Sequence, residues 1–234
     1  MTDSSVPVDD PTAVHRILAN ASALLLDFDG PVCSVFAGLP APVVADQLRE
    51  VLADGGHGDL PPEVEKSADP FDVFSFAATI GDVEARYVEA ALRAHEVEAV
   101  ATAEPTADTH DLIREWHASG RKLAIVSNNS AAAVLSYFHA HDLTHCVDNV
   151  SARREADPGL LKPNPFLLNQ ANDALGTAAS NSVLIGDSLT DIQAARSAGV
   201  RIIGYANKPS KLEEFAAAEP DTIITEMKLI AQRC

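Results

Sequence analysis

The segment Ala23-Leu-Leu-Leu-Asp-Phe-Asp-Gly-Pro-Val32 places the tightest constraint on what this chain can fold into. A run of aliphatic residues predicts a buried strand of a parallel sheet, and side chains two residues apart in a strand point to the same side. Asp27 and Asp29 therefore emerge together at the carboxyl end of this strand, where Gly30 and Pro31 interrupt the ladder. Two carboxylates held close together repel each other unless a cation or a shared proton relieves them. The segment thus indicates a divalent metal, and the alternative is an acidic turn that caps a strand.

Composition narrows the classes of protein to which this chain of 234 residues can belong. Apolar residues make up 47% of the sequence, enough for a large core, and the formal charge of −17 argues against general nucleic-acid binding, which needs a basic surface. Cys33, Cys146 and Cys234 are odd in number and widely spaced, so they predict no disulfide framework. Residues 1–10 lack a secretory pattern, and no apolar run reaches the ~20 residues that span a bilayer. We therefore expect a soluble, cytoplasmic protein with no membrane partner.

Helices and strands alternate regularly after residue 104. Apolar periodicity and turn residues predict helices at 108–119, 130–139, 165–175 and 191–198, and strands at 122–126, 146–150, 182–185, 201–205 and 222–224. Together with the strand that begins at Ala23, this alternation predicts an α/β fold: a Rossmann-like, doubly wound parallel sheet with helices on both faces. Residues 34–104 carry only helical signals, notably at 42–52 and 80–100. We expect residues 1–33 and 105–234 to form the core domain and residues 34–104 to form an inserted all-helical domain.

Polar residues also follow two other predicted strands. Ser127-Asn128 follows the strand at 122–126, Gly186-Asp187 follows the strand at 182–185, and Lys162-Pro163 lies in the loop between them. Ligands of open parallel sheets bind beyond the carboxyl ends of the strands, so we expect these residues to meet the first aspartates there. Each also has an ordinary structural reading: a helix N-cap at Ser127 and Asn128, a solvated Lys162, and acids at a helix dipole at Asp187 and Asp191. Together these readings require four independent coincidences, which favours a shared site.

These are the positions at which the sequence resembles the haloacid dehalogenase-like superfamily, whose members are mainly Mg²⁺-dependent phosphohydrolases. The four motifs occur in the order of that family: Asp27-x-Asp29-Gly30, Ser127-Asn128, Lys162-Pro163 and Gly186-Asp187-(x)3-Asp191. The helical insertion directly after the first motif looks like the cap of the phosphoglycolate phosphatase and β-phosphoglucomutase branch. Each motif is weak alone, but four in order with such a cap are specific. Many relatives have Thr where Pro31 stands, so a hydroxyl is missing there, although proline fixes the turn.

The resemblance implies roles in phosphoryl transfer for the acidic motif residues. Asp27 would attack phosphorus and form an aspartyl-phosphate, and Asp29 would protonate the leaving oxygen and then deprotonate water. Mg²⁺ would bind the carboxylates of Asp27 and Asp187 and the backbone carbonyl of Asp29. Asp191 would support the water shell of the metal or hold Lys162.

The resemblance also implies where phosphate and the rest of the substrate bind. The Ser127 hydroxyl and the Asn128 backbone N–H, at a helix N-terminus, would bind phosphate oxygens, and Lys162 would balance the charge of the transferring group. Substrate choice would lie in the cap, whose Phe71, Phe74 and Phe76 are expected to form its own core. The candidates for contacts with the remaining polar groups of the substrate are Lys66, Arg86, Arg93 and His95.

The expected function is therefore a Mg²⁺-dependent phosphatase that acts on a small phosphorylated metabolite. A phosphomutase is the main alternative, which Lys66 in the cap keeps open. A carbon–halogen hydrolase uses the same nucleophile but needs neither the metal nor Asp29, and a non-catalytic binding module would not need the intact motifs. The sequence sets neither the substrate nor the oligomeric state.

Overall fold

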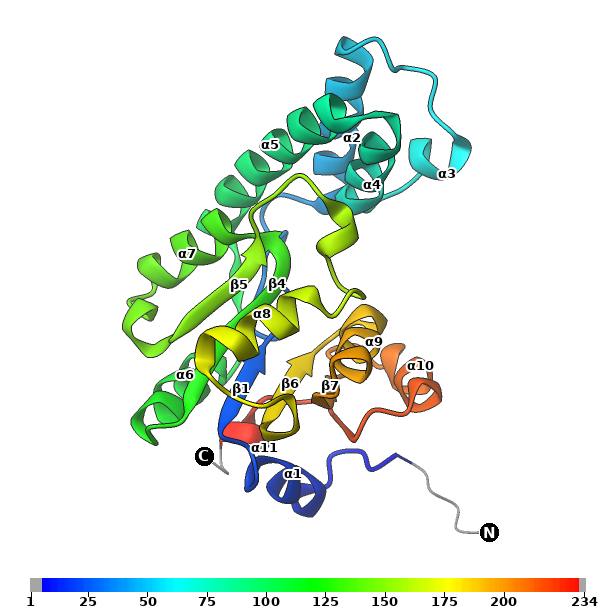
Figure 1. Ribbon diagram of the computed structural model, residues 1–234. Coiled ribbons are helices and arrows are strands. Elements are labelled where there is room, and N and C mark those ends of the chain that lie inside the picture. The colour runs from blue at the N-terminus through cyan, green and yellow to red at the C-terminus, as the bar shows by residue number, and fades with distance from the viewer. Residues whose placement is uncertain (1–5, 232–234) are drawn as a thin grey trace.

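Six parallel strands form one central sheet in the computed structural model, which describes residues 6–231 (Figure 1). The prediction for Cys234, and part of that for residues 1–10, lie outside the described residues. The strand order is β5-β4-β1-β6-β7-β8, so β1 lies between β4 and β6 and the order reverses at β1. The strands are β1 (Ala23–Leu26), β4 (Lys122–Ser130), β5 (Asn149–Arg153), β6 (Ser182–Gly186), β7 (Arg201–Tyr205) and β8 (Thr222–Ile224). The predicted α/β fold with a parallel sheet is confirmed.

Helices cover both faces of the sheet because the strands are buried on both sides. All four residues of β1 are buried, and alternate side chains enter different cores: Leu24 and Leu26 pack on one face, and Leu25 packs on the other. The first face is covered by α1 (Pro11–Leu18), α6 (Thr109–Ala118), α7 (Ala131–Ala140) and α11 (Lys228–Ala231). The second face is covered by α8 (Phe166–Leu175), α9 (Leu189–Ala198) and α10 (Lys211–Ala218).

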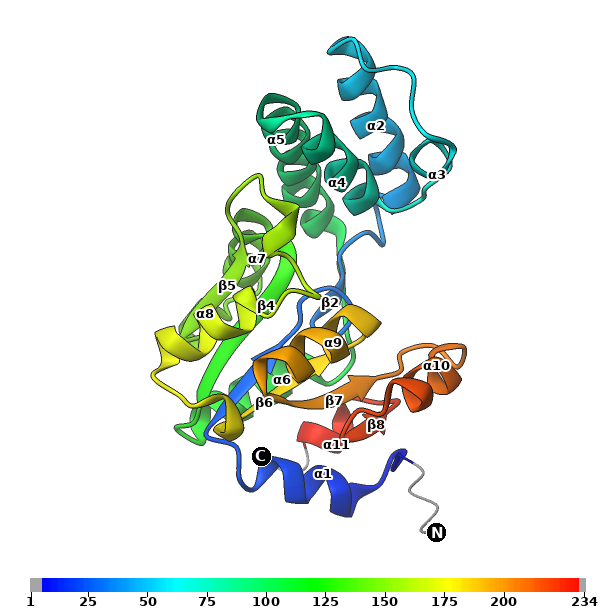
Figure 2. The ribbon, with the colours of Figure 1, turned by 45° about the vertical axis from the view of Figure 1, so that its right-hand side comes forward.

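A helical segment, α2–α5, lies beyond the carboxyl edge of the sheet (Figures 1 and 2). Its helices are α2 (Ala41–Asp54), α3 (Pro62–Glu65), α4 (Pro70–Ile80) and α5 (Asp82–Ala99). Two short antiparallel strands, β2 (Cys33–Ser34) and β3 (Glu104–Pro105), pair the two connections that join this segment to the sheet. The connections coincide with the predicted domain boundaries at residues 33/34 and 104/105, and the division into two domains stays a prediction.

Two local predictions differ from the structure, and one segment gains an assignment. β5 begins at Asn149 and not at Cys146, because residues 144–146 form a 3₁₀ turn and the Asp148 side chain accepts a hydrogen bond from the N–H of Leu123. The segment from Phe71 to Phe76 belongs to α4, whose first turn is capped by Asp69. β4 continues to Ser130, so α7 begins only at Ala131. Within residues 6–231, none of the helices combines the length and the apolar character needed to cross a membrane.

Candidate active site

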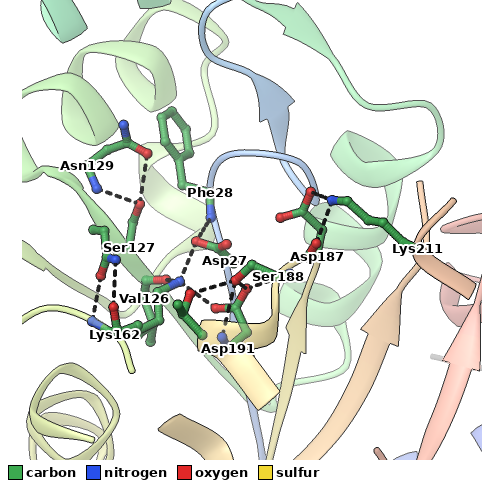
Figure 3. A network of polar contacts seen from close by, with 12 residues as sticks. Asp27, Phe28, Val126, Ser127, Asn129, Lys162, Asp187, Ser188, Asp191 and Lys211 are labelled. Atoms are coloured by element: carbon green, nitrogen blue, oxygen red, sulfur yellow. Dashed lines mark hydrogen bonds and ion pairs between the residues drawn. The ribbon is translucent and has the colours of Figure 1, made fainter. Parts of the chain in front are cut away.

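Three carboxylates meet at the carboxyl edge of the sheet, next to the point where the strand order reverses. Asp27 follows β1, while Asp187 and Asp191 belong to the turn and first helical turn after β6. One carboxylate oxygen from each of these residues lies within 4.8 Å of the others (Figure 3). The predicted convergence of Asp27 and Asp187 is therefore present, and Asp191 joins them.

Glycine is required where the backbone approaches these carboxylates. Gly30 has φ +99°, and a Cβ atom there would lie 2.3 Å from Cγ of Asp187. A Cβ atom at Gly186 would lie 2.4 Å from Cγ of Asp191. The two glycines thus let the loop after β1 and the end of β6 come close enough for the acids to share one space.

Lys162 lies among the carboxylates and is almost fully buried. Its Nζ atom is 2.7 Å from Oδ1 of Asp27 and 2.6 Å from Oδ1 of Asp191, and it donates to the backbone carbonyl of Val126 at 3.2 Å. Burial alone would lower the pKa of Lys162, but the contacts with Asp191 and Asp27 outweigh it and raise the pKa well above its ordinary value. The side chain is therefore a permanent cation at neutral pH.

Asp191 has both carboxylate oxygens in hydrogen bonds. Its Oδ1 accepts from Lys162, and its Oδ2 accepts from the hydroxyl of Ser188 at 2.6 Å and from the N–H of Ser188 at 3.1 Å (Figure 3). Ser188 in turn accepts from the N–H of Asp191 and completes a capping box at the start of α9. This arrangement agrees with the expectation that Asp191 holds Lys162.

The electrostatics of Asp27 favour an additional cation. Burial raises the pKa of Asp27 well above its ordinary value, the negative charge of Asp191 adds to the increase, and Lys162 opposes it. Burial likewise raises the pKa of Asp187, against the effect of Lys211. Clustered carboxylate oxygens are ligands for a hard divalent cation such as Mg²⁺. The carboxylates of Asp27 and Asp187 therefore fit such an ion, with Asp191 beside them holding Lys162.

Asp29 is separate from this group of three acids. Its Oδ1 atom accepts a hydrogen bond of 2.9 Å from the N–H of Val35, in the connection to the helical segment. Burial raises the pKa of Asp29 to about 6, and the hydrogen bond from Val35 works in the opposite direction. A carboxyl group with this pKa can both give and take a proton near neutral pH.

Two threonine hydroxyls support the loop that carries Gly30 and Pro31. The hydroxyl of Thr106 donates to the carbonyl of Gly30 at 2.6 Å, and the hydroxyl of Thr109 donates to the carbonyl of Pro31 at 2.8 Å. Thr106 directly follows β3, and Thr109 is the first residue of α6. The loop therefore has hydroxyl support from a distant segment, although position 31 itself carries none.

Ser127 and Asn128 lie beside Lys162, but not at a helix N-terminus as the sequence suggested. Ser130 is the N-cap of α7, and its hydroxyl accepts from the N–H of Ala133. The side chain of Asn128 pairs with the backbone of Lys162: Lys162 N–H donates to Oδ1 at 2.8 Å, and Nδ2 donates to the Lys162 carbonyl at 3.1 Å. Asn128 thereby fixes the loop that carries the lysine, a contact that the sequence did not predict.

Lys211 and Asn207 also reach the site, and the sequence analysis missed both. Lys211 Nζ lies 2.6 Å from Oδ2 of Asp187 (Figure 3). Asn207 Nδ2 donates to the same oxygen at 2.9 Å. Asn207 follows β7 at the same edge of the sheet. The rule that polar residues after a strand end mark the site would have found it.

A cavity of about 690 Å³ lies between the carboxyl edge of the sheet and the helical segment. The predicted residues that line it on the sheet side are Asp27, Asp29, Ser127, Asn128, Lys162 and Asp187. The lining from the helical segment includes Asp69, Phe71 and Asp72, but none of the four candidates Lys66, Arg86, Arg93 and His95. Phe74 is fully buried in the core of the segment as predicted, whereas Phe71 is only partly buried and also forms cavity wall.

Residues 70–205 match the family model of the haloacid dehalogenase-like hydrolases, which is more than half of the chain. The chain belongs to this family. This haloacid dehalogenase-like hydrolase is 32% identical over 123 residues to a phosphoglycolate phosphatase of Aliivibrio fischeri, covering 53% of each chain. It is 28% identical over 127 residues to the pyrophosphatase PpaX of Halalkalibacterium halodurans, covering 53% of this chain and 57% of that one. The hydrolase thus spans about half the length of the curated relatives it matches.

Solved structures share the fold of this hydrolase over most of its length. CbbY from Rhodobacter sphaeroides, in complex with phosphate, superimposes with a TM-score of 0.63 at 20% identity, covering 91% of this chain and 96% of that one. A haloacid dehalogenase-like family protein from Streptococcus pneumoniae gives a TM-score of 0.63 at 14% identity, covering 92% and 99% of the two chains. The recognition of the family from the four motifs is confirmed.

Proposed function

We propose that this hydrolase is a Mg²⁺-dependent phosphatase that cleaves the phosphate monoester of a small metabolite through an aspartyl-phosphate on Asp27. The observation that carries the proposal is the meeting of Asp27, Asp187, Asp191 and Lys162 beside a cavity that Asp29 and Ser127 also line. Phosphatases among the relatives support the same class of reaction.

In the first step, the Asp27 carboxylate attacks phosphorus while the bond from phosphorus to the alcohol oxygen breaks. Asp29 gives its proton to that leaving oxygen, which departs as the alcohol. In the second step, Asp29 takes a proton from a water molecule, the water oxygen attacks the aspartyl-phosphate, and Asp27 is released with inorganic phosphate. A pKa of about 6 suits Asp29 to both directions of transfer.

Asp27 and Asp187, with the backbone carbonyl of Asp29, would hold Mg²⁺, which would supply positive charge against the phosphate oxygens. Lys162 adds a second cation that stays charged at neutral pH. The Ser127 hydroxyl lies at the cavity wall, where it donates to Oδ1 of Asn129, and it would turn its proton to an oxygen of the bound phosphate. Asp191 contributes by holding Lys162 through the contact of 2.6 Å.

The test is the release of inorganic phosphate from p-nitrophenyl phosphate and from a panel of metabolite phosphates, with Mg²⁺ and with EDTA. We expect EDTA to abolish turnover and added Mg²⁺ to restore it. We expect Asp27→Asn to reduce turnover at least 1,000-fold. Asp173→Asn, which changes an exposed acid on α8, serves as the control and should keep full activity. Full turnover by Asp27→Asn would defeat the mechanism.

The charges around the cavity favour a leaving group that carries no negative charge. The helical segment lines the cavity with the carboxylates of Asp69 and Asp72 and with no basic side chain, and Lys162 is already balanced by two acids. We therefore propose that an amino-alcohol phosphate or a neutral polyol phosphate is a better substrate than a phosphate ester with a carboxylate.

Phosphoethanolamine, glycerol phosphate and phosphoglycolate provide a graded charge series for this comparison. We expect kcat/KM to fall in that order. Asp72→Asn should lower the ratio of kcat/KM for phosphoethanolamine to kcat/KM for phosphoglycolate by about fivefold, since a charge contact near water is worth ~1 kcal/mol. Glu63→Gln changes an exposed acid of α3 outside the cavity lining and should leave the ratio unchanged. A preference for phosphoglycolate would contradict the proposal about charge while leaving the phosphatase mechanism intact.

A further inference from the structure

We propose that Arg153 and Glu96 are positioning residues that hold the irregular end of β4 at residues 127–130, and through it the Ser127 hydroxyl, in place for phosphate. At these residues, called the turn below, the pairing with β5 shifts register and the chain leads into α7. Arg153 ends β5, and Glu96 lies on α5 of the helical segment. The inference rests on the proposed function, because it assumes that Ser127 contacts a phosphate group. Both residues are charged, and both lie outside the four motifs.

The two side chains form a buried, two-pronged ion pair. Arg153 Nη2 lies 2.7 Å from Oε2 of Glu96, and Arg153 Nη1 donates to Oε1 at 3.2 Å. The side chains are only 1% and 0% exposed. A guanidinium and a carboxylate paired in this way have little freedom to rotate, so the geometry around them is well defined.

Glu96 uses the same two oxygens to hold the turn. Its Oε2 atom accepts from the N–H of Ser130 at 2.8 Å, and its Oε1 atom accepts from Nδ2 of Asn129 at 3.2 Å. Arg153 adds a bond from Nη1 to the carbonyl of Asn128 at 3.2 Å. Three successive residues of the turn are therefore bound to one ion pair.

Asn129 passes this restraint on to Ser127. The N–H of Asn129 donates to the Ser127 Oγ atom at 3.1 Å, and Ser127 Oγ donates to Oδ1 of Asn129 at 3.2 Å (Figure 3). The contacts run without a gap from Arg153 through Glu96 and Asn129 to the hydroxyl on the cavity wall. A change in the position of Glu96 must therefore change the position of that hydroxyl.

Helix α4 of the helical segment also contacts Arg153. The guanidinium carbon of Arg153 lies 5.6 Å from the ring centre of Phe71 and 5.5 Å from that of Phe74, both on α4. Glu89, one heptad before Glu96 on α5, accepts from Nε of Arg153 at 3.4 Å and also lies 3.6 Å from Nη1 of Arg93. Unlike Glu96, it forms no hydrogen bond with the described residues 127–130. Since α5 also packs beside α7, the segment and the turn are positioned together (Figure 1).

Stability alone is a weak reason for such a pair, because well-packed apolar side chains often replace a buried ion pair without loss. Apolar replacements would, however, leave the N–H of Ser130 and the amide of Asn129 without the acceptors that Glu96 provides. The polar character of the pair is thus required by the turn.

Glu96→Gln tests the inference, with Glu89→Gln as the matched control. Both variants remove one carboxylate from Arg153, but only the first changes the acceptor of the turn. We expect Glu96→Gln to weaken the binding of inorganic phosphate in calorimetry, and to raise KM, by about tenfold, with the Mg²⁺ concentration for half activation unchanged. Glu89→Gln should change both values by less than twofold.

Asn129→Ala provides an independent route, since it removes the side chain that connects Glu96 to the Ser127 hydroxyl and leaves the ion pair intact. The bond from the Asn129 N–H to Ser127 Oγ is kept in this variant. Asn129→Ala should weaken phosphate binding to a similar extent, and the double variant with Glu96→Gln should be no worse than either single one, because both act through the same path. If Glu96→Gln does not fold, Asn129→Ala alone decides the question. Unchanged phosphate affinity and KM in Asn129→Ala, or an equal loss in Glu89→Gln, would overturn the inference. A wild-type protein that binds phosphate but hydrolyses no ester would instead refute the proposed function.

Discussion

Replacement of Lys162 by methionine removes the ammonium group while keeping the length of the side chain. Nζ of Lys162 lies 2.7 Å from Asp27 and 2.6 Å from Asp191, in a side chain that is 3% exposed. In the variant, the carboxylates of Asp27, Asp187 and Asp191 face each other with oxygens within 4.8 Å. Two unit charges at that distance repel by about 3.5 kcal/mol at an effective dielectric constant of ~20.

The cost of the substitution has a ceiling, because a carboxylate can take up a proton. Protonation of an aspartate with an ordinary pKa of 3.8 costs about 4 kcal/mol at pH 7 and roughly 1.6 kcal/mol at pH 5. We expect Lys162→Met to lower the free energy of unfolding by about 4 kcal/mol at pH 7, as for other broken buried pairs, and by roughly 2 kcal/mol at pH 5. The sign follows because acids whose pKa is raised in the folded state stabilise it at low pH and lose that contribution as the pH rises.

Urea denaturation of the metal-free protein at pH 5, 6 and 7 measures this difference between the variant and the wild type. Lys122→Met is the control, because Lys122 pairs with Asp148 on the surface, with side chains 52% and 30% exposed. Its loss should stay below about 1 kcal/mol and should not shrink toward pH 5. A loss below about 1 kcal/mol at pH 7 for Lys162→Met, or one that grows as the pH falls, would refute the idea that Lys162 neutralises these acids.

Two further substitutions separate the roles of neighbouring residues. Asp29→Asn should reduce turnover at least 100-fold yet stabilise the metal-free protein by up to about 3 kcal/mol above pH 6, because burial raises the pKa of Asp29 to about 6 and its ionised form opposes folding. Urea denaturation at pH 5 and pH 8 checks the sign, and a destabilised variant at pH 8 would contradict it. Gly30→Ala should weaken Mg²⁺ binding at least tenfold, because its Cβ atom would lie 2.3 Å from Cγ of Asp187. Gly120→Ala is the control, because Gly120 also has a positive φ but a Cβ atom there would have nothing within 4 Å. Calorimetric titration with Mg²⁺ compares the metal affinities of the two variants. Gly120→Ala should cost only about 1 kcal/mol of stability and keep the affinity of the wild type. Equal affinities in the two variants would count against the placement of the metal.

The sheet was predictable because each strand carries its own signal. Aliphatic runs in β1, β4 and β6, and the Ile-Ile pairs of β7 and β8, stand out from helices whose apolar residues recur at longer spacing. The exception is β5, where Cys146-Val-Asp148 looks like the start of a strand. Asp148 is instead used as an acceptor for the first residues of β4, and this pairing depends on the folded sheet. Helix α10 carries little signal of its own in the sequence, because Phe215 is its one buried residue, and this ring packs against the backbone of Gly204 on β7.

The motif residues of the candidate site were predictable for a topological reason. Strands that run in parallel bring their carboxyl ends to one edge, so polar residues after each strand must meet there. Lys211 escaped this rule because it lies in α10, four residues beyond Asn207, and only the fold directs it to Asp187. The helix after Ser127 begins one residue later than the predicted residue 130, because β4 continues to Ser130, which caps α7.

Glu96 and Arg153 show why local patterns assign some important residues to the solvent. Glu89 and Glu96 are seven residues apart and share one face of α5, a spacing that on so polar a helix is typical of a solvated stripe. Arg153 is 3% exposed while the adjacent Arg154 is exposed, and nothing in the sequence distinguishes the two. A charge can be buried only where an opposite charge reaches it, and here the partner lies 57 residues away. Two carboxylates seven residues apart on a helix can pair with an arginine at the end of a buried strand. This pairing can be predicted only once the topology is known to place that helix against that strand. The residues that fix the turn carrying Ser127 are therefore set by tertiary pairing, whereas the residues proposed for the chemistry follow from the strand ends.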